Sequence, residues 1–362
     1  MFNSIRLLIL LTAIWLIALS SCSTEKTTQK TIYNIEGSRE GFRIMFYNVE
    51  NLFDTENDPD KRDDDFTPDG ARAWTNFRYQ TKLRQIYQVI VAVGGWDLPE
   101  IVGICEIENR FVLEEVIRRT SLYSSDYKII HYESPDNRGI DVALFYRETK
   151  FTPILHYPIA VNFPEHLSKR PTRDILYVKG VSETDDTLHI FVNHWPSKFG
   201  GEMETKPLRM YCGELVRTHV DSIFNINQRA NIIIMGDFND EPESRCIIES
   251  LNAEYNFSGI LPQSLYNLSY HLKMEKRLGT LKFRGQWGLI DQFIVSGALL
   301  DTLNNIYTSK EHVHIFKADW LTEKDERYGG YQPYRTYIGF RYHGGFSDHY
   351  PTYLDLIGRK QE

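Results

Sequence analysis

Two short polar motifs, about a hundred residues apart, contain side chains that can do chemistry. Gly-Asp-Phe-Asn-Asp at 236–240 directly follows an apolar run, and Phe-Ser-Asp-His-Tyr-Pro occupies 346–351. An aspartate next to a histidine, together with an Asp-x-Asn at the end of a strand, can position a metal ion and a water molecule against a phosphate ester. The alternative for each motif alone is structural, because Asp and Asn after a strand usually cap a helix or form a turn.

Other polar residues follow predicted strands in the same way. Strand ends let a rigid scaffold hold exposed side chains in a fixed geometry. Six such positions of one chemical kind favour a single site over six separate turns. The predicted site contains Asn48, Glu106, His194, Asp237 with Asn239, Asp291, and Asp348 with His349.

Glu106 is the candidate metal ligand. It follows the apolar run 101–105, and a carboxylate at that point suits Mg²⁺, a hard ion that prefers oxygen ligands. The alternative is a salt bridge between Glu106 and Arg110. Glu108 is interpreted as the start of a helix and not as a ligand.

The histidines are candidates for proton transfer. His194 closes the predicted strand 188–193 and can donate to a phosphoryl oxygen or protonate a leaving group, although a structural histidine is the alternative. Asp291 lies in an apolar strand, where an unpaired carboxylate is costly to bury, so we expect it to orient His349. By the same argument Asp141 is expected to orient His194.

Three basic residues are candidates for substrate binding. Arg138 and Arg173 are possible phosphate contacts, because a guanidinium group bonds phosphate in a bidentate manner. Lys198 lies beside Gly200 and Gly201 and either meets an anion or belongs to a solvated loop.

Composition limits the classes of function. The 362-residue chain is 42% apolar and 25% charged, which is ordinary for a globular protein. A net charge of −8 argues against a simple basic nucleic-acid-binding surface, but a bound divalent metal changes the local field and leaves phosphoester substrates open. Cys105, Cys212 and Cys246 show no disulfide or zinc pattern and are predicted to be buried thiols. No feature argues for obligate oligomerisation, so a monomer is expected.

The N-terminal residues predict export. Arg6 precedes the apolar run 7–19, which is shorter than the ~20 residues that span a bilayer and is typical of a signal peptide over 1–21. The Leu-Ser-Ser-Cys ending resembles a bacterial lipobox, which would make Cys22 the lipidated anchor in the cell envelope. An ordinary secretory signal is the alternative. Residues 22–40 are polar and predict a flexible tether before a catalytic domain over 41–362.

Strand and helix patterns alternate after residue 40 without a break in composition. This rhythm favours one α/β domain with two mixed sheets packed face to face and helices outside. The expected strands are 42–47, 101–105, 127–131, 141–146, 174–181, 188–193, 232–235 and 290–295; the expected helices are 74–93, 110–121 and 206–224.

The ordered series of motifs resembles the endonuclease/exonuclease/phosphatase superfamily, which has the deoxyribonuclease-I-like fold. The matching segments are Tyr47–Asn51, Cys105–Ile107, Arg138–Ala143, Asn193–Lys198, Gly236–Asp240, Trp287–Asp291 and Ser347–Pro351. The resemblance implies a four-layer α/β sandwich with the site at one edge of the two sheets.

The resemblance also implies roles. Glu106 would be the principal Mg²⁺ ligand, with Mn²⁺ or Ca²⁺ as other possible ions, and Asn48 would support it. Asp237 and Asn239 would position water and phosphate, and Asp348 would lie near the metal or the water. The remaining implied roles are that Asp291 holds His349 and that His194 stabilises phosphoryl oxygens.

Two departures bear on the branch of the superfamily. Abasic-site endonucleases usually carry asparagine at the position of His194, so this chain is more similar to the nuclease, phosphatase and sphingomyelinase branches. Those endonucleases carry Asp where this chain has Glu50, which leaves a metal role for Glu50 open.

The sequence therefore predicts an exported magnesium-dependent phosphoesterase, with an endonuclease on DNA or RNA preferred. The preference rests on Asn-His-Trp-Pro-Ser-Lys at 193–198, which resembles a segment of secreted bacterial nucleases. The alternatives are a phosphatase, a sphingomyelinase-like phospholipid phosphodiesterase or a non-catalytic surface binding protein. Loops 54–70, 196–206 and 258–288 are expected to shape substrate choice.

Overall fold

The computed structural model describes residues 41–359. The predictions for the signal peptide 1–21, the tether 22–40 and lipidation at Cys22 lie outside the described residues. Within 41–359, every helix is too short or too polar to span a bilayer.

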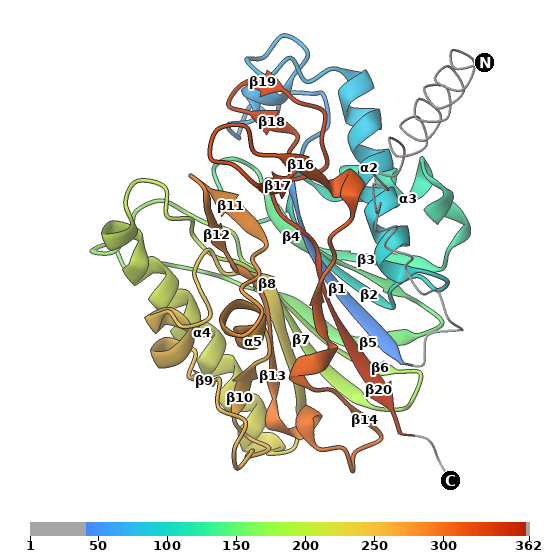
Figure 1. The fold of residues 1–362 in the computed structure, drawn as a ribbon, viewed down its shortest axis with the longest axis vertical. Helices are drawn as coiled ribbons and strands as arrows, with labels where there is room; N and C mark the ends of the chain where they lie inside the picture. The colour runs from blue at the N-terminus through green and yellow to red at the C-terminus, as the bar shows by residue number, and fades with distance from the viewer. Residues whose placement is uncertain (1–40, 360–362) are drawn as a thin grey trace, which may run out of the picture. The chain divides into compact units, whose positions relative to one another are not determined.

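Residues 41–359 form two seven-stranded sheets (Figure 1). The first sheet has the order β14-β20-β1-β2-β4-β3, with β15 also paired to β20, and the second has the order β5-β6-β7-β8-β13-β10-β9. The pairs β1–β2, β7–β8 and β9–β10 are parallel and the others are antiparallel, so both sheets are mixed.

The strand bounds are as follows. The first sheet contains β1 (Phe42–Leu52), β2 (Ile101–Ile107), β3 (Tyr127–His131), β4 (Asp141–Arg147), β14 (Ile306–Tyr307), β15 (Val313–Ile315) and β20 (Thr352–Gly358). The second contains β5 (Phe151–Ile159), β6 (Ile175–Ser182), β7 (Thr187–His194), β8 (Asn231–Asp237), β9 (Ala253–Glu254), β10 (Leu265–Asn267) and β13 (Asp291–Ser296).

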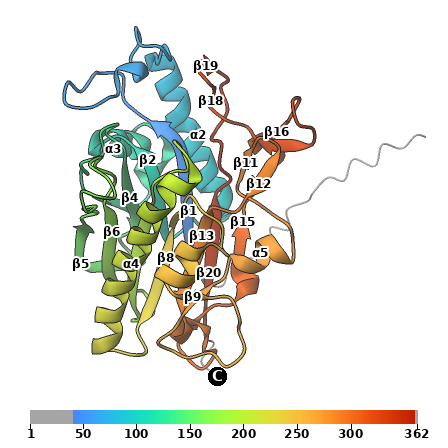
Figure 2. The ribbon, with the colours of Figure 1, turned by 90° about the vertical axis from the view of Figure 1, so that its left-hand side faces the viewer.

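Helices cover the outer face of each sheet, as Figures 1 and 2 show. Buried side chains of α2 (Asn76–Gly94) and α3 (Arg110–Arg118) pack against the first sheet, and those of α4 (Glu202–Ile226) pack against the second. A third apolar cluster fills the space between the two sheets. This arrangement confirms the predicted four-layer α/β sandwich.

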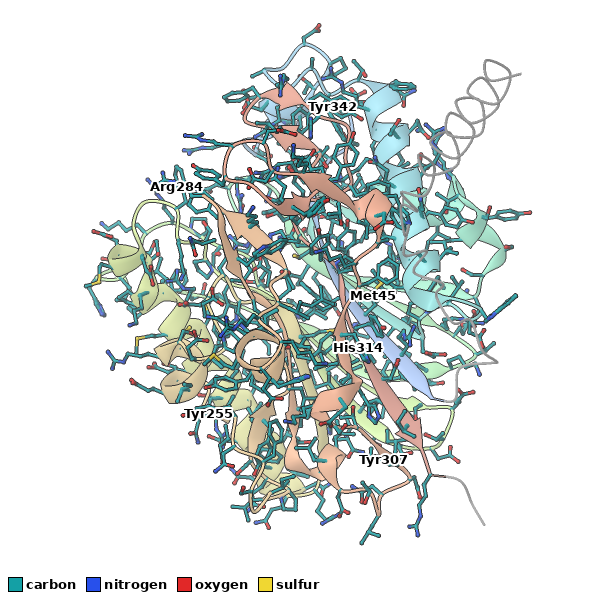
Figure 3. The ribbon with its side chains drawn as sticks, viewed as in Figure 1. Met45, Tyr255, Arg284, Tyr307, His314 and Tyr342 are labelled. Carbon is teal, nitrogen blue, oxygen red and sulfur yellow. The ribbon has the colours of Figure 1, made fainter. Side chains whose placement is uncertain are left out.

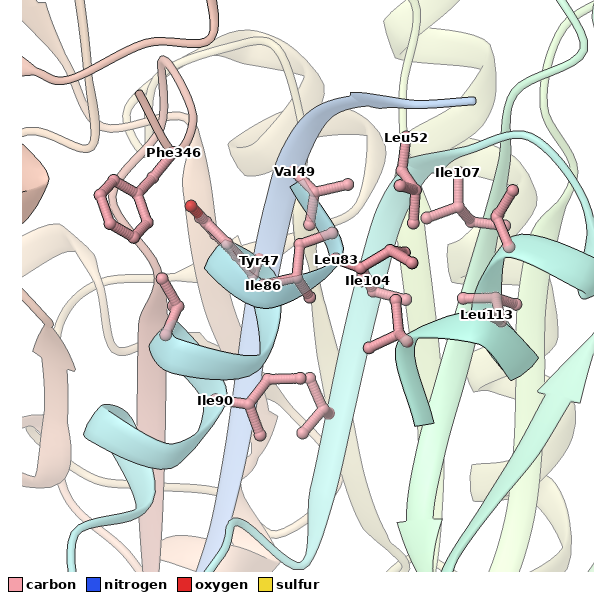
Figure 4. Packing of buried hydrophobic residues seen from close by; sticks show 14 of the residues in the cluster. Tyr47, Val49, Leu52, Leu83, Ile86, Ile90, Ile104, Ile107, Leu113 and Phe346 are labelled. Atoms are coloured by element: carbon pink, nitrogen blue, oxygen red, sulfur yellow. The ribbon is translucent and has the colours of Figure 1, made fainter. Parts of the chain in front are cut away.

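The apolar residues of α2 form the face that packs against the first sheet. Leu83, Ile86 and Ile90 recur at helical spacing, and all three are buried against β1 and β2, where they lie beside Tyr47 and Ile104 (Figure 4). The helix predicted over 74–93 is thereby confirmed.

Most predicted elements are present, but one helix begins earlier than predicted and several strands were not predicted. The hairpins β3–β4 and β6–β7 form as expected. The helix predicted from 206 begins at Glu202, so Pro207 lies inside it, in the second turn, and removes the backbone N–H that would bond the carbonyl of Met203. The sequence did not predict the edge strand β5 or the strand β20, which lies between β1 and β15.

Three short hairpins and a short helix lie between β10 and β20 in the sequence. The hairpins are β11 (Leu281–Phe283) with β12 (Gln286–Gly288), β16 (Thr322–Lys324) with β17 (Tyr331–Pro333), and β18 (Tyr337–Ile338) with β19 (Arg341–Tyr342); the helix is α5 (Tyr270–Met274). The hairpins lie in the upper part of Figure 1, at the end of the sheets where β1 and β8 terminate.

Candidate active site

Strand register places three of the predicted residues in one row across the second sheet. His194 pairs with Asp237 in the parallel ladder of β7 and β8, and Asp237 pairs with Asp291 in the antiparallel ladder of β8 and β13. Because paired residues in neighbouring strands lie side by side, three strands present His194, Asp237 and Asp291 at one edge of this sheet.

The first sheet contributes Asn48 and Glu106 at the facing edge. Asn48 pairs with Cys105, and the register of β2 shifts between Cys105 and Ile107, so Glu106 occupies a bulge. Glu106 has a left-handed φ of 62°. A bulge of this kind re-aims a side chain, and here it turns the carboxylate out of the regular strand pattern.

Direct hydrogen bonds join the two sheets at this edge. Asn48 Nδ2 donates to Asp237 Oδ2 at 3.1 Å. Ser347 Oγ donates to the backbone carbonyl of Asn48 at 2.7 Å and accepts from the backbone N–H of His349 at 3.0 Å. The C-terminal motif is therefore fastened to the end of β1, which brings His349 to the site.

Backbone strain is concentrated around these residues. Of the nine non-glycine residues with left-handed φ within 41–359, four are at the site: Glu50, Asn51, Glu106 and Asn239. The backbone N–H of Asn51 donates to Glu106 Oε2 at 3.0 Å, so the distorted end of β1 holds the Glu106 carboxylate. Such conformations persist only where surrounding contacts over-determine them, and they are enriched at functional sites.

The expected pairing of Asp291 with His349 is present. Asp291 Oδ2 and His349 Nδ1 lie 2.7 Å apart, and both side chains are buried. Burial alone would lower the pKa of His349, but Asp291, Asp348 and Asp237 together raise it well above the usual value. His349 Nε2 lies 3.8 Å from Asp348 Oδ1 and 4.0 Å from Asp237 Oδ2, so the second ring nitrogen faces the site.

His194 has a different electrostatic setting. Its Nε2 lies 3.8 Å from Glu106 Oε1 and 3.7 Å from Asp237 Oδ2, while Nδ1 is buried without a hydrogen-bond partner among residues 41–359. Burial, with Arg173 and Arg138 nearby, holds the pKa of His194 well below its ordinary value. We assign the proton of this neutral ring to Nε2, because that nitrogen faces acceptors.

The expected pairing of Asp141 with His194 is wrong. Asp141 Oδ2 lies 3.0 Å from His131 Nε2, and Asp141 Oδ1 accepts from the backbone N–H of Ser134 at 2.9 Å. The adjacent strands β3 and β4 bring His131 beside Asp141, so both carboxylate oxygens are engaged there. Asp141 therefore orients a different histidine from the one expected.

Asp237 and Asn239 are tied to the same loop. The backbone N–H of Asn239 donates to Asp237 Oδ1 at 2.8 Å, and Asn239 Nδ2 donates to the carbonyl of Trp195 at 2.9 Å. Burial, reinforced by repulsion from Asp291, raises the pKa of Asp237 to about 7. A nearby cation would therefore favour the ionised form of Asp237.

Sequence reasoning missed a charged network behind the site. Arg335 donates to Asp348 Oδ2 at 2.7 Å and lies 3.8 Å from Glu50 Oε1. Glu50 accepts from the backbone N–H groups of Thr336 and Tyr337 at 2.6 and 3.2 Å, so its carboxylate holds this loop. The Glu50 side chain therefore binds the backbone of residues 336–337, which answers the open question of its metal role.

Lys82 belongs to the same network. It is buried in α2 and donates to Thr336 Oγ1 and to the carbonyl of Phe346, each at 2.6 Å. Burial lowers the pKa of Lys82 to about 8. A lysine next to the apolar positions of α2 was the signal in the sequence, whereas Arg335 gave none.

The three basic residues predicted to bind substrate are all engaged within the chain. Arg173 is buried and donates to Asp136 and to the carbonyl of Trp195, so it is a structural residue and not an exposed phosphate contact. Lys198 lies 3.1 Å from Asp240, and Arg138 lies 3.6 Å from Asp136 with half of its side chain exposed. Arg138 is the most accessible of the three.

The donor set fits a hard divalent cation. Glu106 Oε2 accepts from Asn51, while Oε1 makes no hydrogen bond within the described chain and faces His194. Asp237, Asp291 and His349 form one of two groups in residues 41–359 whose possible ligand atoms lie within 4.8 Å of one another, the other being His131, Glu133 and Asp141, but Asp291 already bonds His349 at 2.7 Å. Glu106 Oε1 and Asp348 Oδ1 make no hydrogen bond within residues 41–359 and remain candidates for Mg²⁺, whereas Asn48 Oδ1 already accepts from the backbone N–H of Glu50 at 3.0 Å and would use its second lone pair.

Comparison with known families identifies the chain. A model of the endonuclease/exonuclease/phosphatase family matches residues 43–358, which include every site residue described above. The chain belongs to this family. Members of the endonuclease/exonuclease/phosphatase family are in general hydrolytic phosphoesterases and typically depend on a divalent metal. No curated protein sequence matches the chain significantly.

Solved structures share the fold at low sequence identity. An endonuclease/exonuclease/phosphatase family protein from Bacteroides thetaiotaomicron is 16% identical, with a TM-score of 0.54, over 89% of this chain and 99% of its own. A mannosyl-6-phosphatase of the same organism is 16% identical, with a TM-score of 0.53, over 87% of this chain and 99% of its own. D. rerio TDP2 complexed with single strand DNA product is 13% identical, with a TM-score of 0.53, over 88% of this chain and 99% of its own. These similarities show the fold alone.

Proposed function

We propose that this protein is an exported, magnesium-dependent phosphodiesterase that acts as an endonuclease on DNA or RNA. The observation that carries the proposal is the position of His349, which Asp291 orients from one side while Nε2 faces Asp237 and Asp348. A buried, oriented imidazole beside carboxylates suits proton transfer from water during attack on phosphorus. The family supports phosphoester hydrolysis as the class of reaction.

The side chains of the site have separate roles in the proposed reaction. Glu106, Asn48 and Asp348 would hold Mg²⁺, which when bound polarises a phosphoryl oxygen and neutralises developing charge. In its neutral form His349 takes the proton from water through Nε2, and Asp291 stabilises the resulting imidazolium. A bound Mg²⁺ would favour this neutral form, because it offsets the carboxylates that raise the pKa of His349. His194 keeps its proton on Nε2 and donates to a phosphoryl oxygen. Asn239, fixed by Asp237 and Trp195, orients the phosphate.

A nuclease is preferred over the other phosphoesterases on the motif at 193–198. Trp195 in that motif is buried, its ring NH donates to Asn193 at 3.0 Å, and its carbonyl anchors Arg173. The motif therefore acts as a rigid unit that presents His194. A phosphatase or a phospholipid phosphodiesterase would use the same reacting atoms, so substrate tests must separate the three.

The test is a substrate panel with purified protein. Plasmid DNA, RNA, sphingomyelin and inositol phosphates are each incubated with Mg²⁺ and with a chelator. Cleavage of nucleic acid that the chelator abolishes supports the proposal. Activity confined to lipid or to phosphomonoesters contradicts the nuclease assignment, and Mg²⁺ binding without turnover of any substrate would favour a non-catalytic binding protein.

Export and anchoring belong to the same proposal. We infer that Cys22 is lipidated and that the catalytic domain acts as a monomer in the cell envelope, since a scavenging nuclease needs access to external substrate. Radiolabelled palmitate should be incorporated into the wild type and not into Cys22→Ser, and the variant should move from the membrane to the soluble fraction. Equal labelling of the two proteins would exclude this anchor.

A further inference from the structure

Two hairpins leave the fold directly beside the catalytic histidine. Leu281, the first residue of β11, forms a β-bridge with His349, so β11 starts at the site. Lys282 pairs with Asp325 at 2.7 Å and donates to the carbonyl of Gly329 at 2.6 Å, which joins the β11–β12 hairpin to the β16–β17 hairpin. Figures 1 and 2 show the two hairpins next to each other. We call them together the hairpin arm.

The tips of the two hairpins also touch. A Cβ atom added to Gly285 would lie 3.0 Å from the Cβ of Tyr328, so Tyr328 packs against the β11–β12 turn. The arm is therefore one supported unit and not two independent loops. Its tip lies three residues beyond Leu281, which corresponds to about 10 Å from the pair with His349.

Arg284 occupies the turn of the arm at a conformational cost. The turn residues Arg284 and Gly285 both have left-handed φ values, 49° and 83°, which is the pattern of a type I′ turn. Asn-Gly is strongly preferred in such turns, so arginine is retained here against the local preference. Strain of this kind points to a role for the side chain.

The arginine at the tip is free to meet an anion. Arg284 is exposed, lies 5.1 Å from the ring centroid of Phe283, and has no carboxylate within ion-pair distance in the described chain. Figure 3 shows Arg284 at the outer end of its hairpin. A guanidinium group without an acidic partner attracts phosphate.

Exposed aromatic rings accompany the cations. Phe283 is 63% exposed, Tyr331 is 62% exposed and Tyr328 is 47% exposed. Arg327 repeats the pairing of Arg284 with Phe283, because its guanidinium lies 5.1 Å from the ring centroid of Tyr328. Both tips thus present a cation beside a ring.

We infer that the hairpin arm binds a single-stranded segment of nucleic acid next to the scissile phosphate, with Arg284 on the backbone and Phe283 against a base. A single strand offers phosphates and flat bases in alternation, and proteins bind it with basic grooves and stacking rings. The inference rests on the proposed function, since it assumes that a polynucleotide reaches His349. A membrane surface fits less well, because Glu326 and Arg327 would enter it together with the rings.

The test measures binding without turnover. Fluorescence anisotropy with a labelled single-stranded oligonucleotide is recorded in chelator at several salt concentrations. Arg284→Asn should weaken binding about fivefold and reduce the salt dependence of log K by about 0.7. Its Tm should be equal or higher, because Asn-Gly suits the turn. Phe283→Ala should weaken binding about tenfold.

Matched controls separate a local contact from general charge or hydrophobicity. Arg277→Asn removes an exposed arginine that also has a left-handed φ, 53°, but follows α5, where that conformation is ordinary. Tyr123→Ala removes a ring that is 73% exposed on the segment before β3, outside the arm. Both control variants should bind as the wild type does.

The outcomes distinguish this inference from the proposed function. If the wild type cleaves DNA or RNA while Arg284→Asn and Phe283→Ala bind the oligonucleotide normally, the inferred binding role of the hairpin arm is wrong and the proposed nuclease activity is kept. If the wild type binds the oligonucleotide through the hairpin arm but hydrolyses no nucleic acid with Mg²⁺, the proposed nuclease activity is wrong and the binding role of the arm is kept. Absence of oligonucleotide binding, or Arg284-dependent binding only to phosphatidylglycerol vesicles, overturns the arm.

Discussion

His194 and His349 are both buried in one site, yet their pKa values are shifted in opposite directions. Burial lowers the pKa of each. Asp291 at 2.7 Å from His349 outweighs burial there, whereas His194 has no carboxylate closer than 3.7 Å among residues 41–359. Before metal binds, the site therefore holds one charged and one neutral imidazole at neutral pH. Partner geometry therefore decides which of the two histidines is charged.

Asp291→Asn should lower the pKa of His349, because it removes the charge that opposes burial. A raised folded-state pKa stabilises the protein below the unfolded pKa of about 6.5, and that contribution is lost as pH rises through the folded value. The variant should therefore lose about 3–5 kcal/mol at acidic and neutral pH and less at alkaline pH. NMR titration of the histidine and urea unfolding at several pH values provide the measurement. An unchanged histidine titration would contradict the pairing.

Asp141→Asn is the matched control for that change. It alters an Asp–His pair of similar geometry, 3.0 Å between Asp141 and His131, outside the proposed reaction path. The His349 titration should stay at its wild-type position. Turnover should fall less than tenfold, compared with about 10²–10⁴-fold for Asp291→Asn.

Glu106→Gln should abolish Mg²⁺-dependent hydrolysis by at least about 10²-fold, because the amide keeps the shape and loses the charge that attracts the cation. Glu108→Gln serves as its control. Burial raises the pKa of Glu108 to about 8, so that side chain is mostly protonated already and the amide replaces a neutral group. Kinetic assays and calorimetric titration with Mg²⁺ should separate the two variants; equal loss in both would point to general damage.

At the scale of single residues, the sequence predicted the types of the site residues well, but it predicted only some of their partners. Asp291 with His349 was predictable, because a carboxylate in an apolar strand needs a partner. Asp141 was misassigned, because the cross-strand proximity of His131 depends on the β3–β4 register and not on residue type. Arg335 was invisible, since its salt bridge to Asp348 depends on the path of an irregular loop.

At the scale of elements, bulges and close contacts place the side chains. The helix α4 approaches the π-helix Cys246–Ser250 through Gly213, where an added Cβ would lie 2.7 Å from the carbonyl oxygen of Cys246. The glycine therefore sets how closely α4 packs against this π-helix.

Gly213→Ala should destabilise the fold even though alanine is favoured over glycine in a helix by about 1 kcal/mol. The clash is with backbone, which cannot rotate away, and overpacking of this kind costs about 1–3 kcal/mol. Urea unfolding gives the net sign. Gly358→Ala, where an added Cβ has no neighbour within 4 Å, should be nearly neutral. A stabilised Gly213→Ala would show that α4 can shift outward.

The central strands were predictable and the edges were not. Buried strands such as β2 and β8 are continuous apolar runs that both periodicity and composition reveal. The strand β5 contains Pro153 and Pro158 and is largely exposed, which is tolerated only at the edge of a sheet and hides it from pattern analysis. The alternation of buried and half-buried residues along β20 was a usable signal that the prediction overlooked.

At the scale of the whole molecule, acidic groups from both sheets meet at one edge and repel one another. A divalent cation should therefore stabilise the folded chain as well as activate it. Saturation at 100 times the Kd corresponds to about 2.7 kcal/mol, visible as a rise in Tm that a chelator reverses. Thermal unfolding with and without Mg²⁺ should show this rise in the wild type and not in Glu106→Gln. A rise of the same size in both would place the cation elsewhere.

The pairing of β1 with β20 gives the molecule a built-in delay during synthesis. The strand made first in the catalytic domain can complete its sheet only when the strand after His349 has left the ribosome. A nascent chain stalled before that point carries an unfinished sheet, and one stalled before residue 349 also lacks His349. A chain of this design is thus inactive until almost all of it has been translated, which would keep the proposed nuclease from acting on the cell's own messages and chromosome during synthesis.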